Sequence, residues 1–410
     1  MKYGLIGERL SHSFSRIIHQ KIGGYGYGLY EIPPKHLDSF LKRKEFLGIN
    51  VTIPYKEAVI PYLDFIDEPA KRIGAVNTIV NRDGKLCGYN TDYYGLKALF
   101  IRANIDPKGK KAVILGSGGT SKTALAVLTD LGASSILRVS RYGKGGAITY
   151  EELLTNHFDA RIIVNTTPSG MFPDVHQQPV SLEGFKQLEG VIDVIYNPLN
   201  TSLTKQAKSM GIKSETGLYM LVEQAVRASE LFRDVSIPKS ETERIFDELR
   251  REKENIVLIG MPASGKSTVG KILAERLGRR LVDTDELIEE QTSMSIKDYF
   301  ERYGEDEFRR LESEVIKELS KETSLIISTG GGAILRVENI SALKYNGKLF
   351  FIDRPLEKLI PTDSRPLSSS REAIKARYNE RYSIYCNCCD VRIDADREAD
   401  EVADKIMENL

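Results

Sequence analysis

The sequence has no net charge, no long apolar run and no block of like charge. Lysine and arginine together number 58, as do aspartate and glutamate, so the formal net charge of the 410 residues is zero. Nucleic acids and anionic membrane surfaces attract basic patches, so neither is an expected partner. No apolar stretch approaches membrane-spanning length, and the first residues, MKYGLIGERLSHS, lack the apolar core of a signal peptide. We therefore expect a cytoplasmic protein without a membrane segment.

Cysteine is also scarce. Three of the four cysteines, Cys386, Cys388 and Cys389, form a C-x-C-C cluster that could suggest a metal site, and the fourth is Cys87. The cluster lacks the paired C-x-x-C spacing of a zinc site and has no histidine nearby, which favours reduced, incidental thiols. The length of the chain predicts two or three domains.

Residues 260–267, GMPASGKS, fit the phosphate-loop pattern Gly-x-x-x-x-Gly-Lys-Ser/Thr at every fixed position. The apolar run 256–259 before them predicts a buried strand, and the apolar spacing of 268–277 predicts a helix after them. In that setting the backbone N–H groups of the loop converge on phosphate oxygens at the positive end of the helix. The stretch predicts an ATP-using domain that starts near residue 254, in which Lys266 reaches the outer phosphates and Ser267 holds magnesium.

Four short stretches in the first hundred residues place polar side chains beside predicted strand ends. Residues 2–6 predict a strand, and the hydroxyl-rich SHSFS after them can cap a helix at 16–22 or hydrogen-bond a polyhydroxylated ligand. Residues 48–56, GINVTIPYK, alternate as a strand does until Pro54 ends the ladder and leaves Lys56 at the strand's end. A lone lysine there is usually a solvated charge. GAVNT (74–78) and GYNTD (88–92) pair small residues with Asn and Thr at a strand edge.

A second glycine-rich turn lies further along the chain. Residues 111–115 predict a strand, and GSGGTS (116–121) opens a helix that runs to about residue 131. This is a dinucleotide-type G-x-G-x-x-S turn, in which Ser121 takes the place of the third glycine. The next predicted strand, 135–139, ends at Ser140-Arg141, where NAD-specific sites place an acid for the ribose hydroxyl. Because Arg141 can instead pair with a 2′-phosphate, NADP is favoured over NAD.

The stretch 236–254 is proline-bearing and then strongly charged. Its apolar residues Ile245, Phe246 and Leu249 predict an amphipathic helix that completes the first unit. The boundary to the second unit is expected at about residues 251–254.

Beyond the phosphate loop, RLVDTD (280–285) predicts a strand that ends in two acids. Alternate side chains of a strand share a face, so Asp283 and Asp285 are expected to point the same way at the carboxyl edge of the sheet. Open α/β sheets bind ligands at that edge. The stretches that follow carry arginine and glycine: F-R-R-L-E at 308–312, G-G-G at 330–332, R-P-L at 365–367 and R-Y at 381–382.

Together these stretches resemble two families. The serine pair, NVTIPYK, GAVNT and NTD occur in the order and approximate spacing of shikimate dehydrogenase, and 162–171, 191–198 and 217–224 resemble its segment under the nicotinamide, its closing strand and its returning helix. Residues 255–410 resemble shikimate kinase on the D-x-D, F-R-R-x-E, triple glycine, R-P-L and R-Y. The resemblances imply two consecutive steps of aromatic amino-acid precursor synthesis: NADPH-dependent reduction of 3-dehydroshikimate to shikimate, then ATP-dependent phosphorylation to shikimate 3-phosphate.

The dehydrogenase resemblance implies roles for individual residues. Lys56 supplies the proton that the reduced carbonyl needs, and Asp92 orients Lys56 and binds a substrate hydroxyl. Ser140 replaces the asparagine often found before the cofactor-binding arginine. The positions that match shikimate binding are Ser13, Ser15, Thr52, Lys56, Asn77, Asp92, Tyr196 and Gln224. The positions that match NADP binding are Gly116, Ser117, Gly118, Gly119, Thr120, Ser140, Arg141, Val194 and Gly217.

The kinase resemblance implies Lys266, Asp285 and Arg365 as catalytic residues. Asp285 orients or deprotonates the attacking hydroxyl, and Arg365 reaches over the transferred phosphoryl group from a mobile lid at 359–370. The lid has no second arginine, and Lys358 is the cation just upstream. The ATP positions are Gly260, Ala263, Ser264, Gly265, Lys266, Ser267, Thr268 and Arg365. The shikimate positions are Asp285, Arg309, Gly331 and Arg381, and the Mg²⁺ positions are Ser267 and Asp283.

The expected fold is α/β throughout. A dehydrogenase-like unit at 1–251 would hold an N-terminal α/β substrate subdomain (about 1–103 plus 218–251) and a Rossmann-like NADP subdomain (about 104–217). A P-loop α/β domain with a parallel sheet, like that of nucleoside-monophosphate kinases, would occupy 254–410. The expected partners are the small molecules 3-dehydroshikimate and shikimate, and the chain is expected to be a monomer or homodimer.

Two alternative functions remain open. In one, a domain is catalytically silent and acts as a binding or scaffold module. In the other, the dehydrogenase acts on quinate or shikimate with NAD. Arg141 argues against the use of NAD. The first alternative is disfavoured by the retained residues Lys56, Asp92, Lys266, Asp283 and Asp285.

Overall fold

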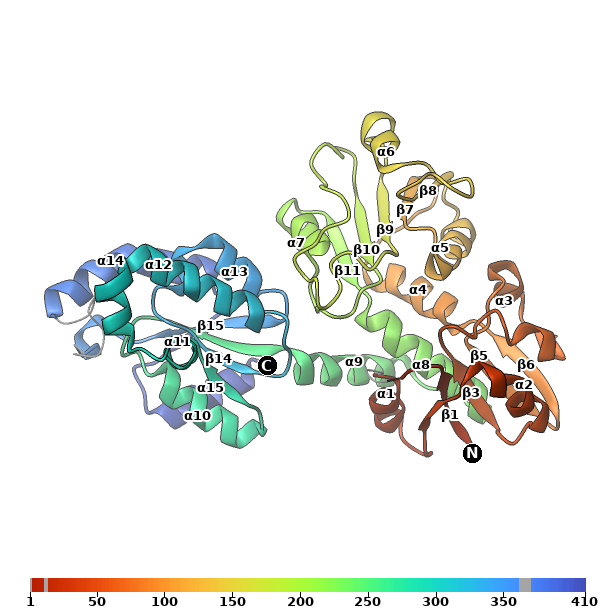
Figure 1. Ribbon diagram of the computed structural model, residues 1–410, viewed down its shortest axis with the longest axis horizontal. Coiled ribbons are helices and arrows are strands. Elements are labelled where there is room, and N and C mark those ends of the chain that lie inside the picture. The colour runs from red at the N-terminus through yellow and green to blue at the C-terminus, as the bar shows by residue number, and fades with distance from the viewer. Residues whose placement is uncertain (1, 11–13, 361–369) are drawn as a thin grey trace. The chain divides into compact units, whose positions relative to one another are not determined.

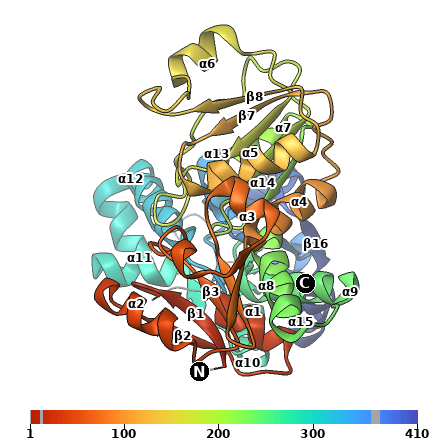
Figure 2. The same cartoon turned by 90° about the vertical axis from the view of Figure 1, so that its right-hand side faces the viewer.

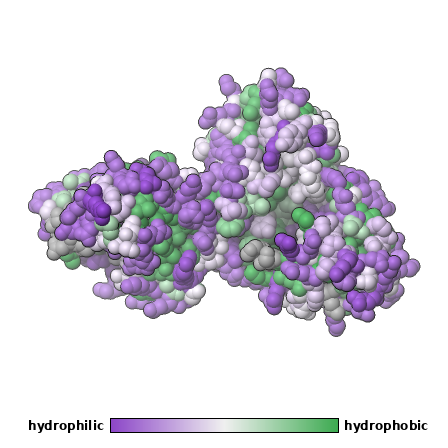
Figure 3. All heavy atoms as spheres, in the orientation of Figure 1, coloured by the Kyte–Doolittle hydropathy of each residue, from purple (hydrophilic) through white to green (hydrophobic). Residues whose placement is uncertain are grey.

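The computed structural model describes residues 2–10, 14–360 and 370–410, and the chain divides into two compact units (Figure 1). The first comprises Met1–Asn197 and Thr201–Leu249, and the second Pro198–Asn200 and Arg250–Leu410. The face of the molecule drawn in Figure 3 is largely hydrophilic. Within the described ranges, no helix is both long enough and apolar enough to cross a membrane.

A mixed six-stranded sheet, in the order β2-β1-β3-β5-β6-β4, forms the first layer of the N-terminal unit. Strand β1 is parallel to β2 and β3, whereas β5 is antiparallel to β3 and β6. Helices cover it with apolar side chains, so that Ile6, Ile49 and Ile79 are fully buried. Its elements are β1 (Tyr3–Gly7), α1 (Ser15–Ile22), β2 (Gly28–Glu31), α2 (Pro34–Arg43), β3 (Gly48–Val51), η1 (Ile60–Tyr62), β4 (Phe65–Ile66), α3 (Glu68–Ile73), β5 (Thr78–Arg82) and β6 (Lys85–Tyr89).

A second sheet of five parallel strands, in the order β11-β10-β9-β7-β8, follows in the same unit. Residues 112–115 of β7 are all fully buried, as expected for a parallel strand covered on both faces. Helices α4 and α8 lie side by side and carry the chain out of and back to the first sheet (Figures 1 and 2). The elements are α4 (Thr91–Arg102), β7 (Lys111–Leu115), α5 (Gly119–Asp130), β8 (Ser135–Val139), α6 (Tyr150–Asn156), β9 (Ile162–Asn165), β10 (Gly190–Asp193), α7 (Ser202–Ser209), β11 (Lys213–Thr216), α8 (Leu218–Arg233) and α9 (Lys239–Lys253).

The second unit is built on a parallel sheet in the order β13-β14-β12-β15-β16. Alternate residues of its central strand β12 enter two separate cores, Ile256 and Leu258 in one and Val257 and Ile259 in the other. The elements are β12 (Asn255–Ile259), α10 (Lys266–Leu277), β13 (Leu281–Asp283), α11 (Thr284–Thr292), α12 (Ile296–Leu319, broken at Gly304), β14 (Ile326–Ser328), η2 (Ala333–Leu335), α13 (Val337–Leu343), β15 (Gly347–Asp353), η3 (Leu356–Lys358), α14 (Arg371–Cys388), β16 (Val391–Asp394) and α15 (Ala399–Glu408).

The predicted α/β fold, with a dehydrogenase-like unit before a P-loop domain, is confirmed. One local prediction was wrong: Asp285 does not continue the strand of Asp283. Strand β13 ends at Asp283, whose carboxylate accepts a hydrogen bond from the Asp285 N–H at 3.0 Å and so caps α11. An aspartate is a strong helix N-cap, and this preference ends the strand two residues earlier than its alternation indicated.

Candidate active sites

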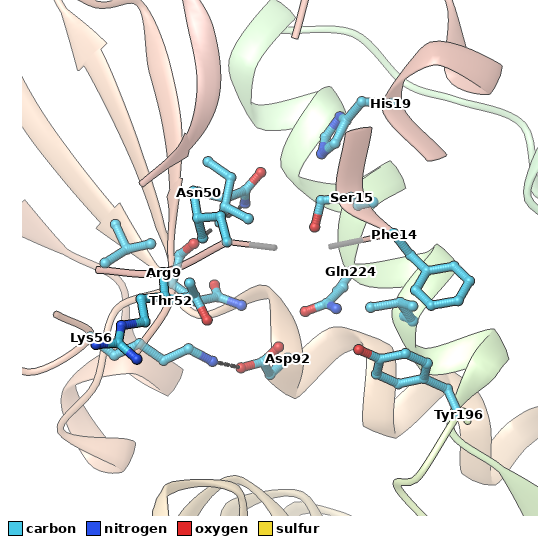
Figure 4. Close-up of a pocket in the computed structure, with 16 residues that line it drawn as sticks. Arg9, Phe14, Ser15, His19, Asn50, Thr52, Lys56, Asp92, Tyr196 and Gln224 are labelled. Atoms are coloured by element: carbon cyan, nitrogen blue, oxygen red, sulfur yellow. Dashed lines mark hydrogen bonds and ion pairs between the residues drawn. The ribbon is translucent and has the colours of Figure 1, made fainter. Parts of the chain in front are cut away.

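A cavity of about 410 Å³ opens in the first unit, lined from the carboxyl edge of the first sheet and by residues of α1, α4 and α8 (Figure 4). In Figure 4 the hydroxyls of Ser15 and Tyr196 and the amide of Gln224 point toward the same space as the Asp92 carboxylate. The polar and aromatic residues that line the cavity are Arg9, Phe14, Ser15, His19, Asn50, Thr52, Lys56, Asn77, Asp92, Tyr196 and Gln224.

Lys56 and Asp92 form an ion pair at this cavity, with Nζ and Oδ2 2.7 Å apart. Lys56 follows β3, which ends at Val51, and Asp92 lies in the first turn of α4. Asn90 caps that helix by accepting the Tyr93 N–H at 3.3 Å. The side chains of the pair are 32% and 16% exposed, so both charges remain accessible from the cavity.

Asn77 fixes the start of the same helix from the neighbouring strand. Its Oδ1 accepts hydrogen bonds from the Thr91 N–H at 2.7 Å and the Thr91 hydroxyl at 3.2 Å. Asn50 donates to the Asn77 carbonyl at 3.3 Å and accepts from the Tyr27 hydroxyl at 2.7 Å. The side chain of Asn50, which lines the cavity, is therefore held by Asn77, just before β5, and by Tyr27.

Of the eight residues predicted to bind shikimate, seven line this cavity, and Ser13 lies outside the described residues. Phe14 occupies the N-cap position of α1 without a side-chain cap hydrogen bond. Sequence reasoning missed Arg9, Phe14, His19 and Asn50. Asn50 could have been found, because it lies two residues before Thr52 on an extended chain and so shares its face.

His19 is the least exposed of the residues that line this cavity. Its ring stacks on Tyr27 with centroids 3.8 Å apart, and its Nδ1 is hydrogen-bonded to the Tyr25 hydroxyl. Burial lowers the pKa of His19 to about 3, opposed by Asn50 and assisted by Arg233. The imidazole is therefore neutral near pH 7. No sequence signal distinguishes it from an ordinary core histidine.

A second cavity of about 840 Å³ lies at the carboxyl edge of the second sheet. Gly116, Ser117, Gly118, Ser140 and Arg141 line it, as the cofactor prediction requires. Tyr142 and Lys144, which were not predicted, also line it; both lie in the loop directly after β8. The two cations and the absence of an acid at the end of β8 suit a phosphorylated ribose.

The remaining predicted cofactor residues do not line this cavity. Gly119 and Thr120 form the first turn of α5, where their N–H groups lie at the positive end of the helix. Gly217 packs directly on the backbone of Val194, so closely that a Cβ would collide with the Val194 carbonyl. These two residues therefore join β10 to the start of α8 rather than form the cavity wall.

A buried carboxyl, that of Asp193, is linked to the second cavity through Asn165. Asp193, fully buried, accepts hydrogen bonds from Asn165 Nδ2 at 3.0 Å, the Ile195 N–H at 3.1 Å and the Thr201 hydroxyl at 2.8 Å. Asn165 in turn accepts from the N–H and hydroxyl of Thr167, which lines the cavity. Burial raises the pKa of Asp193 to about 7, while these three donors oppose the shift.

The phosphate loop of the second unit has the backbone that the motif requires. Gly260 and Gly265 have positive φ angles of 153° and 95°, and a Cβ on Gly260 would lie 2.8 Å from the Ile352 carbonyl oxygen. Lys266 is 5% exposed and donates to the carbonyls of Gly260 at 3.0 Å and Met261 at 2.9 Å. Ala263 and Ser264 complete the loop, and Thr268 lies in the first turn of α10.

The predicted magnesium residues meet beside this loop. The Ser267 hydroxyl donates to Asp283 Oδ2 at 2.8 Å. A hydroxyl and a carboxylate oxygen are the hard donors that Mg²⁺ prefers, and Mg²⁺ usually takes only one or two protein ligands beside phosphates and water. The pair therefore fits a nucleotide-bound Mg²⁺. Residues 2–10, 14–360 and 370–410 contain no group of three or more His, Cys, Asp or Glu side chains that could hold a metal ion. The C-x-C-C cluster therefore does not form such a group.

The predicted kinase substrate residues converge around the triple glycine. A Cβ on Gly330 would lie 2.6 Å from Asp285 Oδ1 and 2.8 Å from Glu312 Oε1, so both carboxylates face this loop. Arg381 Nη1 and the Tyr385 hydroxyl donate to the Gly331 carbonyl at 3.1 and 2.6 Å. Gly332 lies against the Arg309 guanidinium, where a Cβ would collide with it. Asp285, Arg309, Gly331 and Arg381 are therefore brought together.

Arg309 is held in this cluster by a buried ion pair. Its Nη1 lies 2.8 Å from Oε2 of Glu312, which has no exposed surface, and its Nη2 lies 3.2 Å from Glu305. Burial raises the pKa of Glu312, and the charge of Arg309 opposes that shift. The sequence pattern F-R-R-x-E places Glu312 three residues after Arg309, and side chains at that spacing are neighbours on a helix, so this pair could have been predicted.

The predicted lid is only partly described. Arg365 lies outside the described residues. Lys358, the cation offered just upstream, ends η3 and forms an ion pair with Asp396. Its charge is therefore directed toward the loop after β16.

Comparisons with known proteins cover both units. A family model described as shikimate dehydrogenase substrate binding domain matches residues 5–79, and the shikimate kinase model matches residues 262–410. The NADP(+) shikimate dehydrogenase of Clostridium perfringens strain SM101 is 40% identical over 267 residues, which cover 60% of this chain and 98% of that protein. That of Clostridium beijerinckii is 40% identical over 268 residues, which cover 61% of this chain and 98% of that protein.

Solved structures match about three fifths of this chain. Shikimate dehydrogenase 1 from Peptoclostridium difficile is 45% identical with a TM-score of 0.54, over 62% of this chain and 99% of that one. A chorismate mutase/shikimate 5-dehydrogenase fusion protein from Clostridium acetobutylicum is 38% identical with a TM-score of 0.58, over 60% and 96%. The Thermus thermophilus shikimate 5-dehydrogenase, solved with NADP(H) and shikimate, is 30% identical with a TM-score of 0.53, over 60% and 99%. The chain therefore belongs to the shikimate dehydrogenase family and carries a shikimate kinase domain in residues 262–410.

Proposed function

We propose that this protein is a bifunctional enzyme that reduces 3-dehydroshikimate to shikimate with NADPH and then phosphorylates shikimate with ATP. The observation that carries the proposal is the presence of two separate polar sites in one chain. Lys56 and Asp92 are paired at 2.7 Å in the cavity of the first unit. Ser267, Asp283 and the arginine cluster surround the phosphate loop and triple glycine of the second.

In the first reaction, NADPH would supply the hydride that reaches the carbonyl carbon of 3-dehydroshikimate. As that carbon gains the hydride, its oxygen gains negative charge, and Lys56 Nζ donates a hydrogen bond and then a proton to it. Asp92 holds the ammonium toward the substrate and accepts a hydrogen bond from a neighbouring ring hydroxyl. The amides of Asn77 and Gln224 and the hydroxyl of Tyr196 orient the substrate in the same cavity.

The residues after β8 favour NADP as the cofactor. Arg141 and Lys144 line the cavity where a 2′-phosphate on the adenine ribose would lie. The residues directly after β8, Ser140 and Arg141, include no acid that could bind a free 2′-hydroxyl. The NADP(+) dehydrogenases of the clostridial relatives support the same choice. The alternative of a quinate dehydrogenase that uses NAD is therefore disfavoured.

In the second reaction, Lys266 would exchange the carbonyls of Gly260 and Met261 for phosphate oxygens of ATP. Ser267 and Asp283 would hold Mg²⁺, which when bound neutralises phosphate charge. Asp285 accepts a hydrogen bond from the 3-hydroxyl of shikimate and aligns it for attack on the γ-phosphorus. As the new P–O bond forms, the bond from the γ-phosphorus to the β-phosphate oxygen breaks, ADP leaves, and Asp285 takes the hydroxyl proton.

The arginine cluster gives the kinase site its preference for an acid. Arg309 and Arg381 are 9% and 4% exposed, and Glu312 is the fully buried acid between them. The guanidinium groups of both arginines can donate hydrogen bonds to the carboxylate of shikimate. Arg309 is also paired with Glu305 at 3.2 Å, and Arg381 lies 3.7 Å from Glu380.

We also infer that the functional domains are residues 1–251 and 254–410, in a cytoplasmic enzyme that is a monomer or homodimer. The four cysteines are free thiols, as expected in a reducing compartment. Multi-angle light scattering of the full chain tests the oligomeric state, and a stable trimer or larger assembly would contradict it.

Separate half-reaction assays on the full chain test the proposed function. NADPH oxidation by 3-dehydroshikimate without ATP reports the first site, and ADP release from ATP with shikimate but without NADPH reports the second. The wild-type protein is expected to be active in both assays. Loss of one with retention of the other would assign the inactive unit a binding or scaffold role, and loss of both would overturn the proposal.

A further inference from the structure

Arg354 follows the last residue of β15, next to the phosphate loop. Strand β15 pairs with β12, the strand that leads into that loop, and Ile259 is opposite Phe351. A Cβ on Gly265, the loop glycine before Lys266, would lie 3.9 Å from Arg354 Nη1. The guanidinium is therefore beside the N-terminus of α10.

The acids around Arg354 do not neutralise it. Asp353, its chain neighbour, is paired with Arg392 at 2.6 Å and accepts from the Tyr382 hydroxyl at 3.2 Å. Among the described residues Arg354 has no ion-pair partner, and its Nε is buried without a hydrogen-bond partner. A buried guanidinium N–H without an acceptor is costly, so a ligand that accepts it would stabilise this arrangement.

The position of Arg354 also selects the kind of ligand. The N-terminus of α10 carries the positive end of a helix dipole, and Lys266 adds a second positive charge within the loop. A third, unpaired cation there is unfavourable unless an anion occupies the space between them.

We propose that Arg354 is a further phosphate-contacting residue of the kinase site, which binds the phosphate chain of ATP from the side of β15. The inference rests on the proposed ATP-dependent function of this unit. It gives the site a cation directly after strand β15 in addition to Lys266 at the start of α10. Arginine suits this role because its planar group can donate two parallel hydrogen bonds to one phosphate.

The test compares Arg354→Met and Arg354→Lys in the full chain with Arg276→Met as the control. Arg276 lies on the same helix α10, far from the loop, and its exposed pairs with Asp400 and Asp404 lie on the surface. Mg-ADP and Mg-ATP dissociation constants are measured by calorimetry, together with the KM values of ATP and shikimate and the dehydrogenase rate. Arg354→Gln, a second neutral variant, is measured in the same way in case the methionine variant does not fold.

The neutral variants are expected to weaken Mg-ADP and Mg-ATP about tenfold, the usual effect of losing one charge-assisted hydrogen bond. Arg354→Lys should retain most of the affinity, and the shikimate KM and the dehydrogenase rate should remain at wild-type values. Wild-type nucleotide affinity in both neutral variants would overturn the inference and leave the proposed function intact. Failure of the wild-type protein itself to bind Mg-ATP would instead contradict the proposed kinase function and the inference with it.

Discussion

The ammonium of Lys56 lies 2.7 Å from the carboxylate of Asp92 and joins the turn after β3 to the first turn of α4. Asn77 holds the start of α4 by accepting both hydrogen bonds of Thr91. The backbone of two separate elements therefore positions Lys56 and Asp92. Removal of either charge should change the reaction rate more than the fold.

Lys56→Met and Asp92→Asn are expected to lower the dehydrogenase kcat by about 10²-fold to 10⁴-fold, the usual contribution of a positioned proton donor. The measurement is NADPH oxidation at saturating 3-dehydroshikimate. Lys122→Met is the control, because Lys122 forms an exposed pair with Glu57 close by. The kinase rate of all three variants should equal that of the wild type. A Lys56→Met enzyme with more than a tenth of the wild-type rate would show that another group supplies the proton.

Arg141→Asp should reverse the cofactor preference. The loss of a charge-assisted hydrogen bond and the added repulsion of a 2′-phosphate predict a rise of about 10-fold to 100-fold in the NADPH KM. An acid at that position also offers an acceptor to a free ribose hydroxyl, so the KM of NADH should fall. Steady-state kinetics with both cofactors measure the ratio. An unchanged ratio would mean that Lys144, the other cation of this cavity, sets the selectivity.

The adjacent residues Arg309 and Arg310 form a natural comparison in the kinase unit. Arg309 is buried against Glu312, whereas Arg310 forms exposed pairs with Glu307 and Glu314 on its own helix. Arg309→Met should raise the shikimate KM of the kinase by at least about tenfold, because a charge-assisted contact to the carboxylate is lost. Arg310→Met should change it less than twofold.

Because Arg309→Met leaves Glu312 unpaired in the interior, it should also destabilise the unit by about 3–5 kcal/mol. The double variant Arg309→Met/Glu312→Gln removes the orphaned charge and should recover part of that stability without recovering the shikimate KM. Equal shikimate KM values in the Arg309 and Arg310 variants would contradict the assignment of Arg309.

His19 predicts an acid-sensitive first unit. Its imidazole has an ordinary pKa of 6.5 in the unfolded chain, whereas burial lowers that pKa to about 3 in the folded unit. Between these values the unfolded chain binds more protons, so stability falls as the pH is lowered from 6.5 toward 3. The expected contribution between pH 7 and pH 4.5 is about 2–3 kcal/mol.

Scanning calorimetry of the full chain at several pH values checks this prediction. The transition of the first unit is the one that NADP⁺ raises, because a ligand stabilises the state that binds it. His19→Gln should flatten the pH dependence of that transition between pH 6.5 and 4.5, whatever its effect on the absolute Tm. A variant whose transition keeps the wild-type slope would show that another group is responsible.

The sequence predicted those parts of the sites that are local in the chain. The phosphate loop and the glycine turn at 116–118 are each specified by a strand, a turn and a helix within a few residues, and the structure forms these elements in that order. Arg141 was placed just after the strand 135–139, and it lines the second cavity there. The strand 135–139 was predicted with its observed bounds. Ile245, Phe246 and Leu249 were predicted as one apolar helix face, and all three are buried in α9.

Contacts between distant segments were not predictable in the same way. Nothing in the spacing shows that Tyr27 fixes Asn50 or that Lys358 pairs with Asp396. Asp285 was misplaced because alternation of acids was given more weight than the N-cap preference of Asp283. Tyr196 was predicted in the cavity only through the family resemblance, since β10 ends three residues before it at Asp193.

The most direct measurement is one incubation of the full chain with 3-dehydroshikimate, NADPH, Mg²⁺ and ATP, with NADPH loss followed optically and products identified by mass spectrometry. Lys56→Ala and Lys266→Ala proteins are measured in parallel. Two working sites predict shikimate 3-phosphate from the wild type, no shikimate or shikimate 3-phosphate from Lys56→Ala, and shikimate alone from Lys266→Ala. Consumption of NADPH without a phosphorylated product, or phosphorylation of added shikimate with NADPH untouched, would contradict the assignment of two consecutive activities to this chain.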